Sequence, residues 1–148
     1  MKIIQNAMNE IMFNVNGFTN EIGGILGGYD EVITRIVLDV DMKGNTPFKY
    51  VPNVSMLNRC ISSWNEQKIK FYGIFHTHFN DRRLSKNDRN YIINIMNQNS
   101  DNIKKLYFPI IVLPEMKMYV YKAEKKRNKQ IEIVNDKINI CNMEEKYE

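Results

Sequence analysis

The chain has 148 residues, of which 43% are hydrophobic and 26% are charged, and this composition indicates one globular domain with a core rather than a disordered segment. Its net charge of +4 is mild and does not by itself indicate a nucleic-acid-binding protein. No apolar run approaches the ~20 residues that a membrane-spanning helix needs, and residues 1–6 contain no long apolar region of the kind that marks a secretory signal.

The two cysteines, Cys60 and Cys141, lie far apart in the sequence and form no Cys-x-x-Cys pattern. Lone thiols favour a reducing compartment, so we expect the protein in the cytoplasm and not at a membrane. The densest run of basic residues is in residues 125–129, and such a run is more often a solvated loop than a nucleic-acid site. A nucleic-acid partner is therefore not expected.

Hydrophobic periodicity predicts a helix and two strands in the first third of the chain. A helix is expected over residues 3–15, where apolar residues recur at helical spacing. Residues 21–26 read as a strand, residues 27–30 as a glycine-containing turn, and residues 32–40 as a second strand rich in β-branched residues.

The middle of the chain predicts a loop, a helix and a buried strand. Residues 41–47 read as the loop, and residues 53–67 place their apolar side chains on one face of a helix. The strand predicted over residues 69–75 is apolar enough to be central in a sheet and covered on both faces, and it runs directly into His76. A further helix is expected to begin within residues 84–88.

The last third predicts strands only. Residues 106–113 and 116–122 read as two strands, and residues 131–134 and 137–141 as a hairpin around an Asn-Asp pair. The tail over residues 144–148 is expected to be frayed. Because helices alternate with strands and no linker interrupts them, we expect a single α/β domain in which helices flank a mixed sheet.

Both histidines of the chain stand in one short segment, His76-Thr77-His78. Residues two apart on an extended segment point to the same side, so the two imidazoles could bind one metal ion. Zinc accepts neutral imidazole nitrogens at about 2.0–2.1 Å, and two ligands from one strand need no unusual backbone. The alternative is a pair of unrelated polar residues at the entry to a loop, because short motifs often match by chance.

Three further residues supply the remaining parts of a hydrolytic zinc site. Asp88 is a candidate third ligand, Ser85 is a nearby hydroxyl, and Glu21 is a spare carboxylate that could act as a base. Each has a structural alternative. Ser85 and Asp88 have the form of a capping box at a helix start, and Glu21 could be a surface acid where a strand begins. The glycine pairs after Glu21 match neither a dinucleotide-binding fingerprint nor a phosphate-binding loop.

The order and spacing of these residues resemble the JAMM (JAB/MPN) metallopeptidase family. Its signature is a distant Glu, then His-Ser/Thr-His, then a Ser seven residues further on and an Asp three residues after that Ser. This chain has Glu21, the His-Thr-His segment, Ser85 and Asp88 in that order and spacing. The resemblance covers about residues 4–122, is nearest to the short prokaryotic members, and leaves residues 123–148 as a C-terminal extension of the single domain.

The chain departs from the family pattern in three places. The family usually has Pro directly after the second His and often has Pro before the Ser, where this chain has Phe79 and Leu84. Both prolines shape a loop and neither does chemistry, so the departures leave the expected activity intact. Many members also begin with a strand before the first helix, and here there is almost no room for one.

The resemblance implies a cytidine-deaminase-like α/β domain that holds one zinc ion through His76, His78 and Asp88, with water as the fourth ligand. It implies that Glu21 is the general base and that Ser85 donates a hydrogen bond to the oxyanion. The bond cut would be an amide or isopeptide at the C-terminal tail of a ubiquitin-like modifier. The reaction would be deconjugation or precursor processing, and the setting could be a bacterial ubiquitin-like or antiviral signalling system.

Three other functions stay open. A peptidase that trims the C-terminus of a sulfur-carrier protein would use the same chemistry. A non-enzymatic scaffold of MPN type would usually have lost a ligand or the Glu, whereas this chain keeps every position. A DNA-linked role rests on the positive charge, and it predicts binding that weakens steeply with salt.

Overall fold

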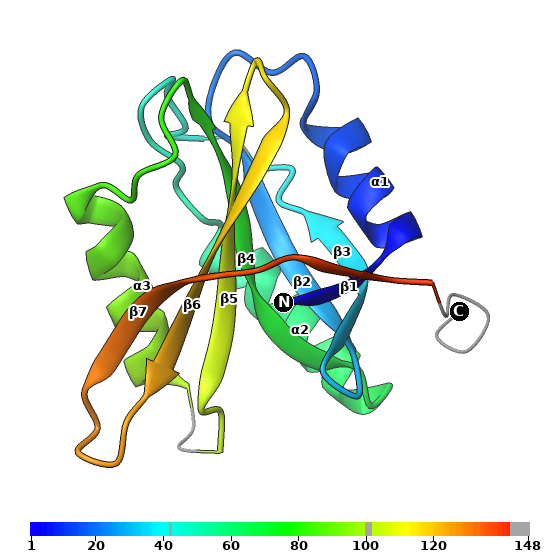
Figure 1. The fold of residues 1–148 in the computed structure, drawn as a ribbon, viewed down its shortest axis with the longest axis vertical. Helices are drawn as coiled ribbons and strands as arrows, with labels where there is room; N and C mark the ends of the chain where they lie inside the picture. Colours follow the sequence, from blue (N-terminus) through cyan, green and yellow to red (C-terminus); the bar gives the residue numbers. More distant parts are fainter. Residues whose placement is uncertain (42, 100–101, 143–148) are drawn as a thin grey trace.

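The computed structural model describes residues 1–41, 43–99 and 102–142. Within them the chain forms one mixed sheet of eight strands, in the order β7-β6-β5-β4-β2-β3-β1-β8, with three helices (Figure 1). The strands are β1 (Lys2–Ile4), β2 (Gly23–Tyr29), β3 (Val32–Leu38), β4 (Lys70–Phe79), β5 (Lys105–Leu113), β6 (Lys117–Lys125), β7 (Ile131–Asp136) and β8 (Asn139–Cys141). The helices are α1 (Gln5–Val15), α2 (Val54–Glu66) and α3 (Lys86–Gln98). The predicted fold class, a single α/β domain with a mixed sheet flanked by helices, is confirmed.

The helices cover both faces of the sheet, with α1 on one face and α2 and α3 on the other (Figure 1). The core under α1 includes Ile11 of that helix and Phe75 of β4. The core under α2 and α3 includes Trp64, Ile92 and, from β4, Ile74. None of the helices in the described part of the chain is long and apolar enough to cross a membrane. Adjacent residues of β4 point into different cores, so this strand is buried on both faces, as its apolar sequence predicted.

Strand β4 lies in the middle of the sheet, antiparallel to β2 and parallel to β5. Its pairing with β5 continues as far as Phe79, which lies opposite Leu113. Both histidines therefore lie within the strand, and the prediction that it ends at residue 75 is wrong. The polar residues His76, Thr77 and His78 give no sequence signal of a buried strand. The backbone pairing nevertheless continues through them and fixes the directions in which their side chains point.

Strand β2 is also longer than predicted, since it runs to Tyr29 and contains the glycines that we expected in a turn. A Cβ atom at Gly27 would lie 2.5 Å from the ring of Trp64. This glycine therefore allows α2 to approach the sheet closely. The actual turn consists of Asp30 and Glu31, with φ of 52° and 63°.

The N-terminus contains a strand that the sequence did not predict. Residues Lys2–Ile4 form β1, which lies parallel to both β3 and β8, and α1 begins only at Gln5. The predicted helix over residues 3–15 thus starts two residues too early, and the expectation of almost no room for a strand is corrected. Three residues are too few to show an alternating pattern, and β1 exists because two other strands pair with it.

The predicted C-terminal hairpin is wrong. Strand β7 pairs antiparallel with β6, whereas β8 pairs parallel with β1 at the opposite edge of the sheet. Asp136, which we expected in the turn, ends β7, and its carboxylate binds the amino group of Met1. The chain after β7 crosses the curled sheet to reach β1 (Figure 1). The Asn-Asp pair favours a turn, but pairing with a distant strand determines the structure here. The predicted frayed tail over residues 144–148 lies outside the described residues.

Candidate metal centre

His76 and His78 project from β4 toward the face of the sheet that α2 and α3 cover. Their side chains are 2% and 9% exposed, and their Nε2 atoms lie 3.0 Å apart. Strand residues two apart face the same way, so the predicted pairing of the imidazoles is confirmed. They are not unrelated polar residues at a loop entry.

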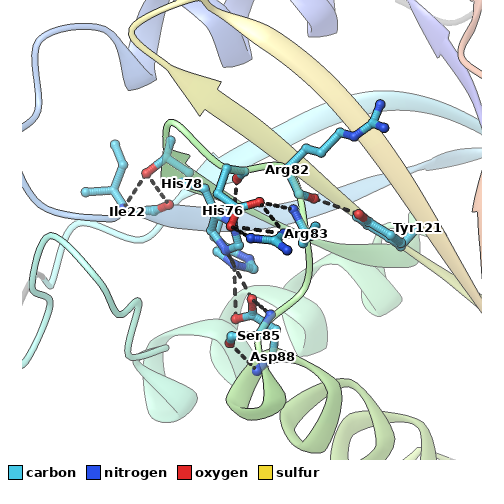
Figure 2. Close-up of polar contacts among 10 residues, drawn as sticks. Ile22, His76, His78, Arg82, Arg83, Ser85, Asp88 and Tyr121 are labelled. Carbon is cyan, nitrogen blue, oxygen red and sulfur yellow. Dashed lines mark hydrogen bonds and ion pairs between the residues drawn. The ribbon is translucent and has the colours of Figure 1, made fainter.

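Asp88 of α3 faces the two imidazoles with its carboxylate, one oxygen toward each ring (Figure 2). Its Oδ1 lies 3.3 Å from Nε2 of His76, and its Oδ2 lies 3.0 Å from Nε2 of His78. Ligands of a tetrahedral zinc ion at the usual bond lengths are separated by about 3.3 Å. The three donors therefore have both the chemistry and the spacing of a metal site.

Ser85 and Asp88 form a capping box at the start of α3. The backbone N–H of Asp88 donates to Oγ of Ser85 at 3.0 Å, and the backbone N–H of Ser85 donates to Oδ2 of Asp88 at 2.9 Å. One carboxylate thus caps the helix and also faces the histidines, so the capping box does not exclude Asp88 as a candidate metal ligand. The Ser85 oxygen accepts the capping bond, and its hydrogen is left for another acceptor.

Glu21 reaches the centre from the segment that precedes β2. The backbone N–H of Ile22 donates to Oγ1 of Thr77 at 2.9 Å, and the backbone N–H of Thr77 donates to the carbonyl of Ile22 at 2.8 Å. These bonds continue the antiparallel pairing of β2 with β4 and bring Glu21 opposite His78. Glu21 is 5% exposed, and one of its carboxylate oxygens lies within 4.8 Å of a ligand nitrogen of each histidine. It is a buried acid close enough to share a metal ion with them.

The ionisable groups of the centre differ in proton affinity. Burial raises the pKa of Glu21 to about 7. Burial also acts to raise the pKa of Asp88, but hydrogen bonds to both imidazoles outweigh it and hold that pKa well below its usual range. Burial lowers the pKa of His76, whereas the hydrogen bond to Asp88 and the nearby carboxylates outweigh burial at His78 and raise its pKa. Asp88 is therefore ionised beside the imidazoles, as a metal ligand must be. Glu21 can take up a proton near neutral pH, as a base must.

Sequence reasoning missed the aromatic residues around the centre. The ring of Tyr50 stacks on His76 with centroids 5.8 Å apart, and Tyr91 meets the same imidazole edge-on at 6.4 Å. Asp39 accepts a hydrogen bond from the Tyr50 hydroxyl at 2.8 Å. Asp39 and Tyr50 lie on either side of the predicted loop over residues 41–47. Hydrophobic periodicity in this part of the sequence does not indicate that either side chain is near the centre.

No protein-family model matches the chain, and no curated protein matches its sequence. Solved structures that resemble it include the following two. Protein DSY2949 from Desulfitobacterium hafniense is 17% identical, with a TM-score of 0.69 over 95% of this chain and 92% of its own. AF2198, a JAB1/MPN domain protein from Archaeoglobus fulgidus, is 17% identical, with a TM-score of 0.52 over 95% of this chain and 98% of its own. These likenesses show that the chain has a JAB1/MPN-like fold, as the sequence motif predicted.

Proposed function

We propose that the chain is a zinc-dependent peptidase or isopeptidase that hydrolyses the amide bond at the C-terminus of a ubiquitin-like modifier. The observation that carries the proposal is the triangle of His76, His78 and Asp88 with the buried Glu21 beside it. One fold can support many functions, so these side chains carry the proposal and the JAB1/MPN-like fold only supports it.

His76, His78 and Asp88 would hold the metal ion. Two imidazole nitrogens and one carboxylate are a donor set that zinc accepts, and catalytic zinc sites commonly use three protein ligands. Bound zinc would supply a Lewis acid that lowers the pKa of water from 15.7 to about 7. The burial of both histidines keeps bulk water away from these two donors, which favours binding of a cation between them.

Glu21 would take the proton of the attacking water and pass it to the departing amine. Its position supports this role, because the bonds between Thr77 and Ile22 hold the adjacent backbone against β4. In the metal-free chain, burial raises the pKa of this carboxyl to about 7, so in that state it can exchange a proton near neutral pH.

Ser85 would donate a hydrogen bond to the oxyanion of the substrate. Its oxygen already accepts a bond from the Asp88 N–H, so its hydrogen is free to point at a substrate oxygen. The N-terminus of α3 adds partial positive charge at the same place. Such a donor contributes about 2.7–4 kcal/mol to the transition state at comparable sites.

The segment over residues 39–54 would contact the substrate tail. Three of its apolar side chains are largely exposed, namely Val40 (70%), Phe48 (89%) and Val54 (62%). The segment is joined to the centre through Tyr50, which stacks on His76. An extended modifier tail could lie against these side chains with its last peptide bond at the metal.

The test uses the purified chain with added zinc and a modifier or carrier encoded beside its gene. Three substrates separate the alternatives: a linear fusion of the modifier to a reporter, the same modifier joined to a lysine side chain, and a sulfur-carrier protein extended beyond its glycine tail. Mass spectrometry identifies the bond that is cut. Glu21→Gln is the inactive variant, and Glu10→Gln, an exposed acid on α1, is the matched control.

We expect cleavage after the last residue of the modifier by the wild type and by Glu10→Gln, far slower cleavage by Glu21→Gln, and none in the presence of a chelator. Cleavage of the carrier extension alone would replace deconjugation with the trimming function. If the zinc-loaded protein cleaves none of the substrates, the proposal fails and an MPN-type scaffold becomes the better account.

A further inference from the structure

The two histidines are held in place by different means. Nδ1 of His78 lies 3.0 Å from the backbone carbonyl of Asp81, which can accept its N–H. Nδ1 of His76 is buried and has no hydrogen-bond partner among the described residues. A histidine that binds a metal almost always donates its second ring N–H to a partner, which fixes the plane of the ring. His76 therefore needs another means of orientation.

Aromatic contacts supply that orientation. The ring of Tyr50 lies nearly parallel to His76, at an interplanar angle of 20° and a centroid distance of 5.8 Å. Tyr91 meets the imidazole at 82° and 6.4 Å. Both arrangements are geometries that aromatic rings favour, and together they restrict rotation of the His76 ring about its side-chain bonds.

Tyr50 is itself anchored by a buried carboxylate. Asp39 is fully buried, and its Oδ2 accepts hydrogen bonds from the Tyr50 hydroxyl and from the backbone N–H of Asn53, both at 2.8 Å. The backbone N–H of Asp39 donates to the carbonyl of Gly23 at 2.8 Å. The anchor is thus connected to β2 beside the centre and does not depend on the loop alone.

Gly23 provides the space for the Tyr50 ring. It is the residue of β2 that pairs with His76 across the sheet. A Cβ atom at this position would lie 2.7 Å from Cε2 and from Cζ of Tyr50, and 2.5 Å from the carbonyl oxygen of Phe75. No side chain fits there without moving the tyrosine, so glycine at this position allows the ring to reach the imidazole.

From these contacts we infer that Tyr50, anchored by Asp39 and admitted by Gly23, is a positioning residue that fixes the ring plane of His76 for metal binding. The inference rests on the metal centre of the proposed function but not on its peptide substrate. Tyr50 is not a ligand and need not touch the reacting atoms. His78 is oriented by a hydrogen bond from its Nδ1. His76 lacks such a bond, and the ring of Tyr50 takes over its orienting role.

The test is a titration of the metal-free full-length chain with Co²⁺, followed by visible absorption, which reports both the affinity and the coordination geometry. Tyr50→Leu removes the ring, and Tyr50→Phe keeps the ring but removes the hydroxyl. Tyr72→Leu and Tyr72→Phe are the matched controls, because the Tyr72 hydroxyl also takes part in a hydrogen bond, which it accepts from the backbone N–H of Glu31 at 2.8 Å. Circular dichroism establishes that each variant is folded.

We expect Tyr50→Leu to weaken Co²⁺ binding by about 10–100-fold, the range found for residues that support a metal ligand, and to change the absorption spectrum. Tyr50→Phe should recover most of the affinity, and both Tyr72 variants should match the wild type. If Tyr50→Leu does not fold, Tyr50→Met takes its place, because the flexible Met side chain refills the space. We expect the same loss of Co²⁺ affinity and the same change of spectrum.

A folded variant without the ring that keeps the affinity and the spectrum of the wild type would overturn the inference and leave the metal centre standing. Failure of the wild type itself to bind Co²⁺ would instead overturn the metal centre, and the inference with it.

Discussion

The two sides of the candidate centre are built in different ways. On the strand side, Glu21, His76 and His78 are all buried, and sheet pairing holds them in place. On the helix side, Ser85 is exposed and Asp88 half-buried, and one capping box at the start of α3 holds both. Substitutions on the strand side are therefore expected to act through long-range structure. Substitutions on the helix side should act through a single local motif.

The largest effect is expected at Glu21. Glu21→Gln keeps the size of the side chain but removes the base, so we expect kcat to fall by roughly 10²–10⁴-fold while the zinc content stays the same. Single-turnover rates with a cleavable modifier fusion, together with elemental analysis, measure both quantities. Full activity of the variant would contradict the assignment of Glu21 as the base.

Ser85 tests the helix side, because its hydroxyl caps α3 and is also the proposed donor to the oxyanion. Ser85→Ala should lose about 1 kcal/mol of stability with its cap, whereas Ser85→Gly should lose only a few tenths. Both variants lack the donor to the oxyanion, so kcat should fall by about 10²–10³-fold in each. Thermal unfolding and kinetics separate the two effects. If Ser85→Gly loses much less kcat than Ser85→Ala, in parallel with its smaller loss of stability, the hydroxyl acts only as a cap.

Thr77 tests the link between Glu21 and the strand. Thr77→Val keeps the shape but leaves the backbone N–H of Ile22 without its side-chain partner, at a cost of about 1–3 kcal/mol. Metal binding should be unchanged, and kcat should fall by up to about 10²-fold because the base is displaced. An equal loss of metal affinity would mean that the substitution disturbs the histidines instead of Glu21.

The smallest effect concerns the stability of the metal-free protein. Burial raises the pKa of Glu21 from 4.5 to about 7, so folding favours the protonated carboxyl. The stability that this contributes is complete below about pH 4.5 and is lost as the pH rises through about 7. In the presence of a chelator, Glu21→Gln should therefore unfold at a higher temperature than the wild type at alkaline pH. The difference should shrink as the pH falls, and thermal scans that show a constant difference would contradict a buried, proton-holding Glu21.

The same two sides explain how far the sequence could predict the structure. The helix side was predictable, because Ser85 and Asp88 lie three residues apart and a capping box is a local signal. The histidine pair was predictable for the same reason, since residues two apart on a strand share a side.

Features that depend on long-range pairing were not predictable. The three residues of β1 become a strand by pairing with β3 and β8, and those of β8 by pairing with β1 from the other end of the chain. Tyr50 reaches His76 because Gly23, in another strand, leaves room for it, and no local pattern around Tyr50 encodes that approach. Glu21 was identified by its place in a family motif, and its burial became visible only in the folded structure.

The central claim is that Asp88 binds the metal together with the histidines while Glu21, although close, does not. Zinc content per chain, measured by elemental analysis after zinc loading, tests it in the wild type, His78→Ala, Asp88→Asn and Glu21→Gln. We expect about one zinc ion per chain in the wild type and in Glu21→Gln, a clear reduction in Asp88→Asn, and loss in His78→Ala. Zinc retained by Asp88→Asn but lost from Glu21→Gln, or absent from the wild type, would contradict it.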